Sequence, residues 1–264
     1  MSARPGQNRP PDAAAIRGMF DKLAARYDLF NHLTSMGLAA WWRHEALKSI
    51  AKGMHILDLG CGTGDLAIAA AKRLKGEGTV SGIDFSERML AIAERRCDRE
   101  ELTGSVRPRF ILEKAEALPV EKEPYDIVVS AFVLRNLYQN IDAILQGVLR
   151  SLKPGGRISF LDITEPRNPL IRAGWRLYMN TLVALYGRIL FGADYPTFYL
   201  TESAHRFLRA HEFSQRLLAA GFEEVKARPF LLGVVTLYQA QKSAVPARVA
   251  GNVRLAGAGG QLKA

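Results

Sequence analysis

Three glycines at alternate positions, directly behind a short apolar run, constrain the fold of this chain most. The apolar run spans residues 54–59, the glycines are Gly60, Gly62 and Gly64, and a segment with helical periodicity follows at 66–74. Glycine permits a tight turn there, and the helix N-terminus then faces the loop. The order predicts a strand, a turn and a helix, which is the beginning of a parallel α/β sheet.

Short apolar runs continue to alternate with helical segments along the chain. The further predicted strands cover residues 79–83, 110–112, 125–131, 157–162, 222–228 and 233–241. The predicted helices between them cover 87–97, 141–152 and 213–220. Together these segments predict an α/β fold with a mostly parallel seven-stranded sheet, helices on both faces and a closing antiparallel hairpin.

Composition shifts divide the chain into four predicted parts. Residues 1–12 read as a disordered leader, and 13–50 as an N-terminal helical cap of two helices that is broken at Ser35-Met36-Gly37. The α/β domain covers 51–242 and carries a helical insertion, rich in aromatic residues, at 165–204. Residues 243–264 read as a disordered basic tail.

The charge balance indicates an anionic partner. The 264 residues hold 36 Lys and Arg against 26 Asp and Glu, for a net charge of +10. Nucleic acid, a phospholipid surface or an acidic ligand would each suit that charge. The only cysteines, Cys61 and Cys97, make a disulfide framework implausible and favour a reducing cytoplasm. No apolar stretch reaches the roughly 18 residues of a membrane span.

An acid behind the second predicted strand supports a nucleotide-type ligand. Asp84 stands twenty positions after Gly64, where a carboxylate can accept hydrogen bonds from both hydroxyls of a ribose. The glycine spacing differs from that of dinucleotide loops, and Asp65 at the helix start disfavours a pyrophosphate electrostatically. The ligand is therefore expected to carry a ribose without a pyrophosphate.

Several motifs together resemble one family. The glycine loop resembles the first motif of Rossmann-like, class I S-adenosylmethionine-dependent methyltransferases. The blocks Tyr27-Asp28-Leu29-Phe30-Asn31, Phe132-Val133-Leu134-Arg135-Asn136-Leu137 and residues 150–156 resemble those of the ubiquinone/menaquinone biosynthesis C-methyltransferases. The resemblance extends over roughly residues 17–242.

The resemblance implies a methyl donor, an acceptor and a set of site residues. S-adenosylmethionine would be the cofactor, and the residues that would hold it are Tyr27, Asp58, Gly60, Gly62, Thr63, Gly64, Asp84, Phe85, Met89, Lys114, Ala115 and Ala131. Arg135 and Asn136 would act in catalysis by gripping the oxygen of a prenylated quinol. Lys114 is a departure from the family, which has an acid or amide there.

The acceptor would come from a lipid phase, which gives the charge a meaning. The insertion would form an apolar pocket for the prenylated ring, and the basic residues would hold a cytoplasmic enzyme against the anionic inner face of the membrane. No general base is evident; His205 and His211 are the nearest candidates by chain position. Benzoquinol and naphthoquinol acceptors, and the oligomeric state, are not distinguished.

Three other functions compete with this one. A phospholipid amine or a natural-product phenol could be the acceptor instead. A nucleic-acid methyltransferase is disfavoured, because residues 130–133 lack the Asn-Pro-Pro-Tyr type of motif that holds a flipped base. A non-catalytic binding module is disfavoured by the glycine loop with Asp84, and no cluster with metal-ligand spacing is visible.

Overall fold

The computed structural model describes residues 13–104, 107–118, 123–192, 195, 203 and 209–244. The predicted leader, most of the predicted tail and much of the second half of the insertion lie outside these residues. The sheet consists of β1 (His55–Leu59), β2 (Thr79–Asp84), β3 (Arg109–Leu112), β4 (Tyr125–Ala131), β5 (Leu152–Ile163), β6 (Phe222–Phe230) and β7 (Val235–Lys242).

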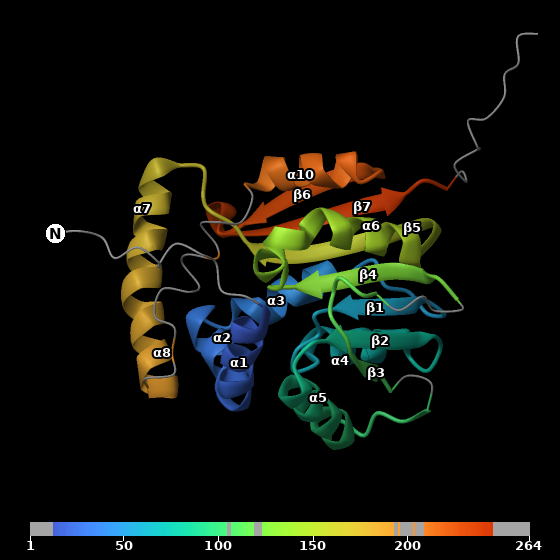
Figure 1. Cartoon of the computed structure of the whole chain (residues 1–264), viewed down its shortest axis with the longest axis horizontal. Coiled ribbons are helices and arrows are strands. Elements are labelled where there is room, and N and C mark those ends of the chain that lie inside the picture. The colour runs from blue at the N-terminus through green and yellow to red at the C-terminus, as the bar shows by residue number, and fades with distance from the viewer. Residues whose placement is uncertain are drawn as a thin grey trace, which may run out of the picture.

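The strand order is β3-β2-β1-β4-β5-β7-β6, with β7 antiparallel to both of its neighbours (Figure 1). This order confirms the predicted seven-stranded, mostly parallel sheet with a closing hairpin. The sheet differs most from the prediction at β5, which begins at Leu152 rather than at 157. Pro154 and the two following glycines predicted a break, but Leu152 pairs with Tyr125 and an irregularity in the register absorbs the extra residues.

The helices fall into a cap, the sheet layers and the insertion. Their bounds are α1 Ala13–Leu23, η1 Ala24–Arg26, α2 Tyr27–Thr34, α3 Leu38–Ala46, α4 Asp65–Leu74, α5 Glu87–Arg99, η3 Leu134–Asn136, η4 Tyr138–Asn140, α6 Ile141–Ser151, α7 Pro169–Tyr178, η5 Met179–Val183, α8 Ala184–Phe191, α10 Ala210–Ala219 and η7 Leu231–Gly233. The break at 35–37 occurs where it was predicted, and a short 3-10 turn also splits the first predicted helix.

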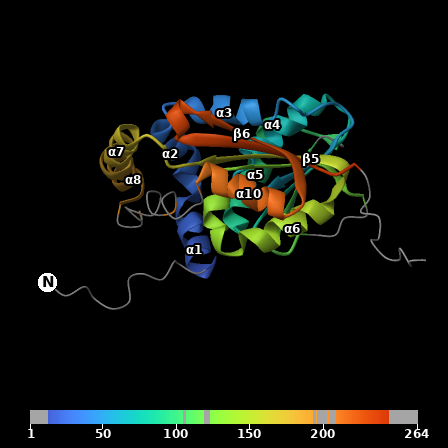
Figure 2. The same cartoon turned by 90° about the horizontal axis from the view of Figure 1, so that it is seen from above.

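Two buried clusters, one on each face, hold the sheet. Residues of α6 and α10 pack with β4 and β5 on one face, whereas α4 packs on β1 and β2 on the other. Figure 2 shows α3 and α4 on the side of the sheet opposite to α6 and α10. The layers are thus those of a doubly covered α/β sheet.

The insertion forms a separate layer beside the cap. It runs as a helix from Pro169 through a π-helical turn to Phe191, beginning at Asn168, whose side chain accepts a hydrogen bond from the Leu170 amide. Its buried face packs against Phe30 of α2, apart from the main core. Figure 1 shows α7 and α8 in yellow at one end of the molecule, next to α1 and α2.

Candidate active site

A cavity of about 410 Å³ lies at the edge of the sheet where β1, β2 and β4 end. Parallel strands bring their carboxyl ends to one edge, so segments far apart in sequence meet there. The predicted cofactor residues that line the cavity are Tyr27, Asp58, Gly60, Gly62, Thr63, Asp84, Phe85, Met89, Lys114, Ala115 and Ala131. Of the predicted set, only Gly64 is not among the lining residues.

The three glycines of the loop have different structural roles. A Cβ on Gly60 would lie 2.5 Å from Val133 Cγ1, so the loop and the segment behind β4 approach too closely for any side chain. At Gly62 nothing lies within 4 Å of the added atom, and the backbone borders the cavity. Gly64 adopts φ +83° and packs near Ala93 of α5, so it shapes the start of α4 rather than the cavity wall.

Asp84 ties the glycine loop to the strand beside it. Its Oδ2 accepts a hydrogen bond from the Gly62 amide and its Oδ1 accepts one from the Ser86 amide, both at 2.9 Å. Burial raises the pKa of Asp84, and these amide donors oppose that shift. The carboxylate thus shapes the loop and also borders the cavity.

Asp58 is the most deeply buried acid of the cavity. It is 1% exposed, and burial raises its pKa to about 8. Within the described part of the chain, its Oδ2 has no hydrogen-bond partner. Such an oxygen lacks a hydrogen-bond donor, and a cationic donor would also stabilise the ionised carboxylate. The ammonium of S-adenosylmethionine meets this need, so the residues present fit the cofactor.

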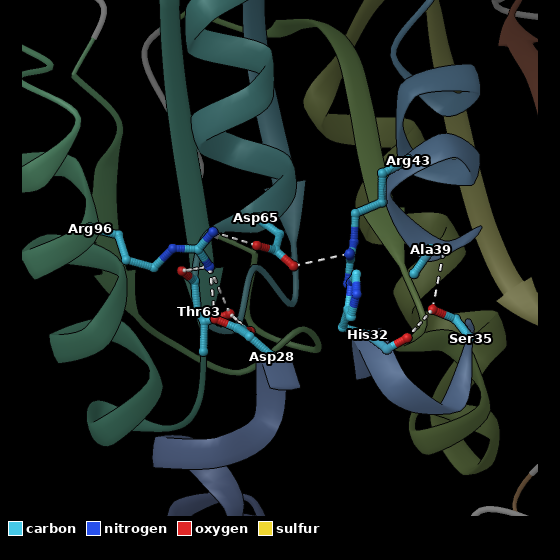
Figure 3. A network of polar contacts seen from close by, with 8 residues as sticks. All are labelled: Asp28, His32, Ser35, Ala39, Arg43, Thr63, Asp65 and Arg96. Carbon is cyan, nitrogen blue, oxygen red and sulfur yellow. Dashed lines mark hydrogen bonds and ion pairs between the residues drawn. The ribbon is translucent and has the colours of Figure 1, made fainter. Parts of the chain in front are cut away.

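A network of ionic contacts links the cap to the glycine loop (Figure 3). Thr63 Oγ1 donates to Asp28 Oδ1 at 2.6 Å, and Arg96 Nη1 donates to Asp28 Oδ2 at 3.0 Å. Arg96 Nη2 also contacts Asp65 Oδ1 at 2.6 Å, and Asp65 Oδ2 in turn contacts Arg43 Nη1 at 3.0 Å. The network joins α2, α3, α4 and α5 at one point.

This network was not predicted from the sequence. Two arginines surround Asp65, so its negative charge is compensated and the electrostatic argument against a pyrophosphate loses its force. The conclusion about the ligand then rests on the glycine spacing. An acid at the first position of a helix was a visible signal, but Arg43 and Arg96 are 22 and 31 positions away in the chain, and only folding brings them to it.

Tyr27 of α2 closes the cavity on the cap side. Its ring lies 5.8 Å, centroid to centroid, from that of Phe20 of α1, in an edge-to-face arrangement. Burial raises the pKa of Tyr27, and the positive charges of Arg135 and Arg43 oppose the shift. The phenol is therefore neutral at physiological pH and presents a polar group to the cavity.

A second cavity, of about 300 Å³, adjoins the first at Phe132. Its walls come from α2, α3, α7, η5 and the segment around η7, and they are largely apolar: Thr34, Met36, Ala39, Trp42, Ile163, Ile171, Gly174, Trp175, Tyr178, Met179, Val183, Leu231, Leu232, Val234 and Val235 belong to them. Phe132 borders both cavities. It has φ +64°, which is unusual for an aromatic residue and is typical of strained positions at functional sites.

The two predicted catalytic residues face different cavities. Asn136 lines the first cavity and Arg135 the second. Arg135 Nη1 donates to Asp162 Oδ1 at 2.8 Å and to the Phe132 carbonyl at 2.6 Å, and the Arg135 and Asp162 side chains are 3% and 0% exposed. Arg135 and Asn136 thus line adjoining cavities, and their joint grip on one substrate oxygen stays a prediction.

The structure also places Asn31 at the second cavity. Its Nδ2 is buried and, among the described residues, has no hydrogen-bond partner. In the sequence, Asn31 stands out only as the last residue of the motif at 27–31. His211 lies exposed on α10 and lines neither cavity, and His205 lies outside the described residues.

No group of three His, Cys, Asp or Glu side chains among the described residues could hold a metal ion. Likewise, none of the helices described is long and apolar enough to cross a bilayer.

Residues 9–242 match the model of the ubiE/COQ5 methyltransferase family. The chain belongs to this family. This membership confirms the predicted enzyme class: the protein is a methyltransferase, and S-adenosylmethionine is its methyl donor.

The sequence is similar to those of named relatives along almost their whole length. The methyltransferase is 35% identical over 234 residues to a "Demethylmenaquinone methyltransferase" of Lactiplantibacillus plantarum, covering 87% of this chain and 96% of the relative. It is also 35% identical over 243 residues to a "Ubiquinone/menaquinone biosynthesis C-methyltransferase UbiE" of Syntrophotalea carbinolica, covering 91% and 96%.

Solved structures support the fold. The magnesium protoporphyrin IX methyltransferase of Synechocystis with bound S-adenosylmethionine superimposes with a TM-score of 0.55 at 16% identity, covering 90% of this chain and all of that one. At this identity the likeness extends to the class I methyltransferase fold, as the sequence predicted.

Proposed function

We propose that the methyltransferase moves a methyl group from S-adenosylmethionine to a ring carbon of a polyprenylated quinol in ubiquinone or menaquinone biosynthesis. One observation carries the proposal: the first cavity, with the predicted cofactor residues, and a largely apolar second cavity adjoin at Phe132, which lines both. Methyl transfer needs donor and acceptor about 3 Å apart and in line. The names of the relatives support the quinol.

The first cavity would hold the cofactor by charge and shape. Asp58 would pair with the ammonium of its amino-acid part, and Asp84 would accept hydrogen bonds from the ribose. Phe85 and Met89 would contact the adenine, and Ala115 would offer its backbone amide. Lys114 lies at the solvent-exposed edge of the same cavity. The bound cofactor supplies an electrophilic methyl group.

The second cavity would hold the quinol ring and the start of its isoprenoid chain. Its apolar wall, built partly by the helix that begins the 165–204 insertion, suits a prenylated ring. Besides the hydroxyl side chains of Thr34, Ser35 and Tyr178, the polar groups of that wall are the Asn31 amide and the Arg135 guanidinium. The amide would donate to a ring oxygen, and the cation that Asp162 holds in place would stabilise the phenolate that activates the ring carbon.

The cap would exclude water from the reaction. Tyr27 lines the first cavity and Asn31, one helical turn later, lines the second, so α2 covers the junction of both. A closed junction prevents hydrolysis and strengthens the electrostatic contacts inside it. Opening of α1 and α2 would then admit the cofactor.

The enzyme would work in the cytoplasm, at the inner face of the membrane. A polyprenylated acceptor resides in the bilayer, and the net charge of +10 suits the anionic headgroups on that side. Nucleic acid is not needed to account for the charge.

The test is the fate of labelled methyl groups. Purified protein is incubated with labelled S-adenosylmethionine and membranes from a strain that lacks its quinone C-methyltransferase. Label is expected in the quinone fraction, and chromatography of that fraction would also distinguish a benzoquinone from a naphthoquinone. Label only in phospholipid or in RNA would refute the quinol as acceptor.

Paired variants separate donor binding from turnover. Asp84→Asn is expected to weaken S-adenosylmethionine binding at least tenfold by calorimetry. The double variant Arg135→Gln/Asp162→Asn is expected to keep that affinity within about twofold and to lose at least tenfold in turnover. Both partners are replaced because a single change would leave a buried charge unpaired. Unchanged turnover of the double variant would remove Arg135 from the mechanism.

A further inference from the structure

Three apolar side chains stand exposed at the mouth of the second cavity. Met36, Leu231 and Leu232 line the cavity and are nevertheless 70%, 49% and 73% exposed. All three have left-handed backbones, with φ of +52°, +44° and +57°. Met36 lies in the turn between α2 and α3, whereas the leucines belong to η7 between β6 and β7.

Positive φ combined with an exposed apolar side chain does not stabilise the fold of an isolated chain. Bulky side chains rarely adopt positive φ, and strain of this kind persists at functional sites where the surrounding structure enforces it. Exposure to water forgoes the hydrophobic gain that would offset the strain. Two separate turns hold these residues in the same way at one opening, so the opening is expected to meet an apolar environment.

The helix on one side of this opening is apolar on its outer surface as well. Leu170, Leu177, Leu185 and Ile189 are each more than half exposed, although neighbouring residues such as Ile171 and Trp175 line the cavity from the inner side. The wall that separates the cavity from solvent is thus apolar on both sides.

The charge of the same segment has a single sign. Residues 166–192 contain no Asp or Glu, and their four cations are Arg167, Arg172, Arg176 and Arg188. The adjacent acid, Glu165, pairs with Arg176 at 2.6 Å and with Arg172 at 3.9 Å. An apolar outer face flanked by arginines complements an anionic lipid surface.

We propose that Met36, Leu170, Leu231 and Leu232, here called the rim, insert into the apolar layer of an anionic bilayer and form the entry of a lipid-soluble acceptor into the second cavity. The bilayer contact stands on the geometry of the rim, and the entry route rests in addition on the proposed function. A second copy of the chain suits the surface less, because a two-fold contact would bring the same arginines together.

The test uses vesicles of phosphatidylglycerol and phosphatidylcholine and a change that suits the backbone. Met36→Asn/Leu232→Asn removes two rim side chains, and Asn tolerates positive φ better than Met or Leu, so the fold is preserved. Co-sedimentation in 0.1 M salt is expected to show binding of the wild type, at least tenfold weaker binding of the variant, and weaker binding of the wild type in 1 M salt.

Two further variants complete the design. Leu170→Gln changes a rim residue in helical backbone that does not line the cavity, and it is expected to weaken vesicle binding while turnover of a water-soluble, short-chain quinol stays unchanged. Leu218→Gln is the matched control, an exposed leucine of α10 away from both cavities, and it is expected to bind vesicles like the wild type.

Each result has one interpretation. Vesicle binding that is absent in the wild type, or equal in the wild type and both rim variants, overturns the proposal. Concentration-dependent self-association that only the rim variants lose would assign the rim to a second copy and also overturn it. If the rim binds vesicles but no quinol is methylated, the proposed function fails and the bilayer contact stands. If the short-chain quinol is methylated but the protein does not bind vesicles, the bilayer contact fails and the proposed function stands.

Discussion

Asp58 shows most directly how a single residue depends on burial. Burial raises its pKa to about 8, against about 3.9 for a free Asp side chain. Between these values the folded state binds a proton that the unfolded state has released. The free energy of unfolding of the ligand-free protein therefore falls as pH rises from about 4 to 8 through this group.

We expect Asp58→Asn to remove this pH-dependent contribution to stability and to weaken the binding of S-adenosylmethionine. Urea unfolding between pH 5 and 8 should show a smaller loss of stability in the variant than in the wild type. Calorimetry should show at least a tenfold loss of S-adenosylmethionine affinity, because the amide offers no charge to the ammonium. The increase of wild-type affinity from pH 6 to 8, where the carboxyl ionises, should also disappear.

Asp142→Asn, on an exposed part of α6, is the matched control. It should leave the affinity and its pH dependence unchanged. The same pH dependence of affinity in Asp58→Asn as in the wild type would show that another group titrates.

At the scale of elements, the ionic network decides how firmly the cap covers the glycine loop. Arg96 contacts Asp28 of α2 and also Asp65 of α4, and its side chain is 23% exposed. Burial, followed by the nearby charge of Asp65, raises the pKa of Asp28, so the two acids depend on the arginine between them.

We expect Arg96→Gln to loosen α2 without unfolding the sheet. The free energy of unfolding should fall by about 1 to 2 kcal/mol, the range for partly buried charged hydrogen bonds. The dissociation rate of S-adenosylmethionine should rise at least fivefold in stopped flow, since Thr63 of the same network lines its cavity.

Arg107→Gln provides the comparison. Arg107 also contacts two acids, Glu94 at 2.6 Å and Asp98 at 2.8 Å, but all three side chains are at least 32% exposed and none lines the cavity. Exposed pairs of this kind contribute little. Equal dissociation rates for the two variants would contradict a special role of the network.

The whole molecule consists of a rigid sheet and two peripheral helical layers with separate contacts. The main clusters lie between the sheet and its helices, whereas α7, η5 and α8 pack against the cap in a cluster of their own. Residues of α1 and α2 line the cofactor cavity, but those of α7 and η5 line only the second cavity.

Hydrogen exchange should resolve these layers. Amides of β1 and β4 should exchange slowest, and those of α1 and α7 much faster, because regions with small buried clusters open locally. S-adenosylhomocysteine should protect α1 and α2 and leave α7 and α8 unchanged. Equal protection of both layers would show that the two cavities are coupled through the cap.

Much of the fold follows from local chemistry. The glycine loop and the alternation of strands and helices are consequences of backbone freedom and hydrophobic periodicity over a few residues, and they predicted the sheet. The predicted cofactor residues meet because strand ends gather at one edge of a parallel sheet.

Tertiary structure alone decided the rest. Arg43 and Arg96 come to Asp65 from other helices, and Asp162 comes from β5 to hold Arg135, so no local pattern could show which charges are compensated. The rim likewise combines turns some 195 positions apart, at Met36 and Leu231. Local sequence determines which elements form and at which end of the sheet the predicted cofactor residues gather. Long-range packing determines which side chains are neutralised, buried or left facing outward.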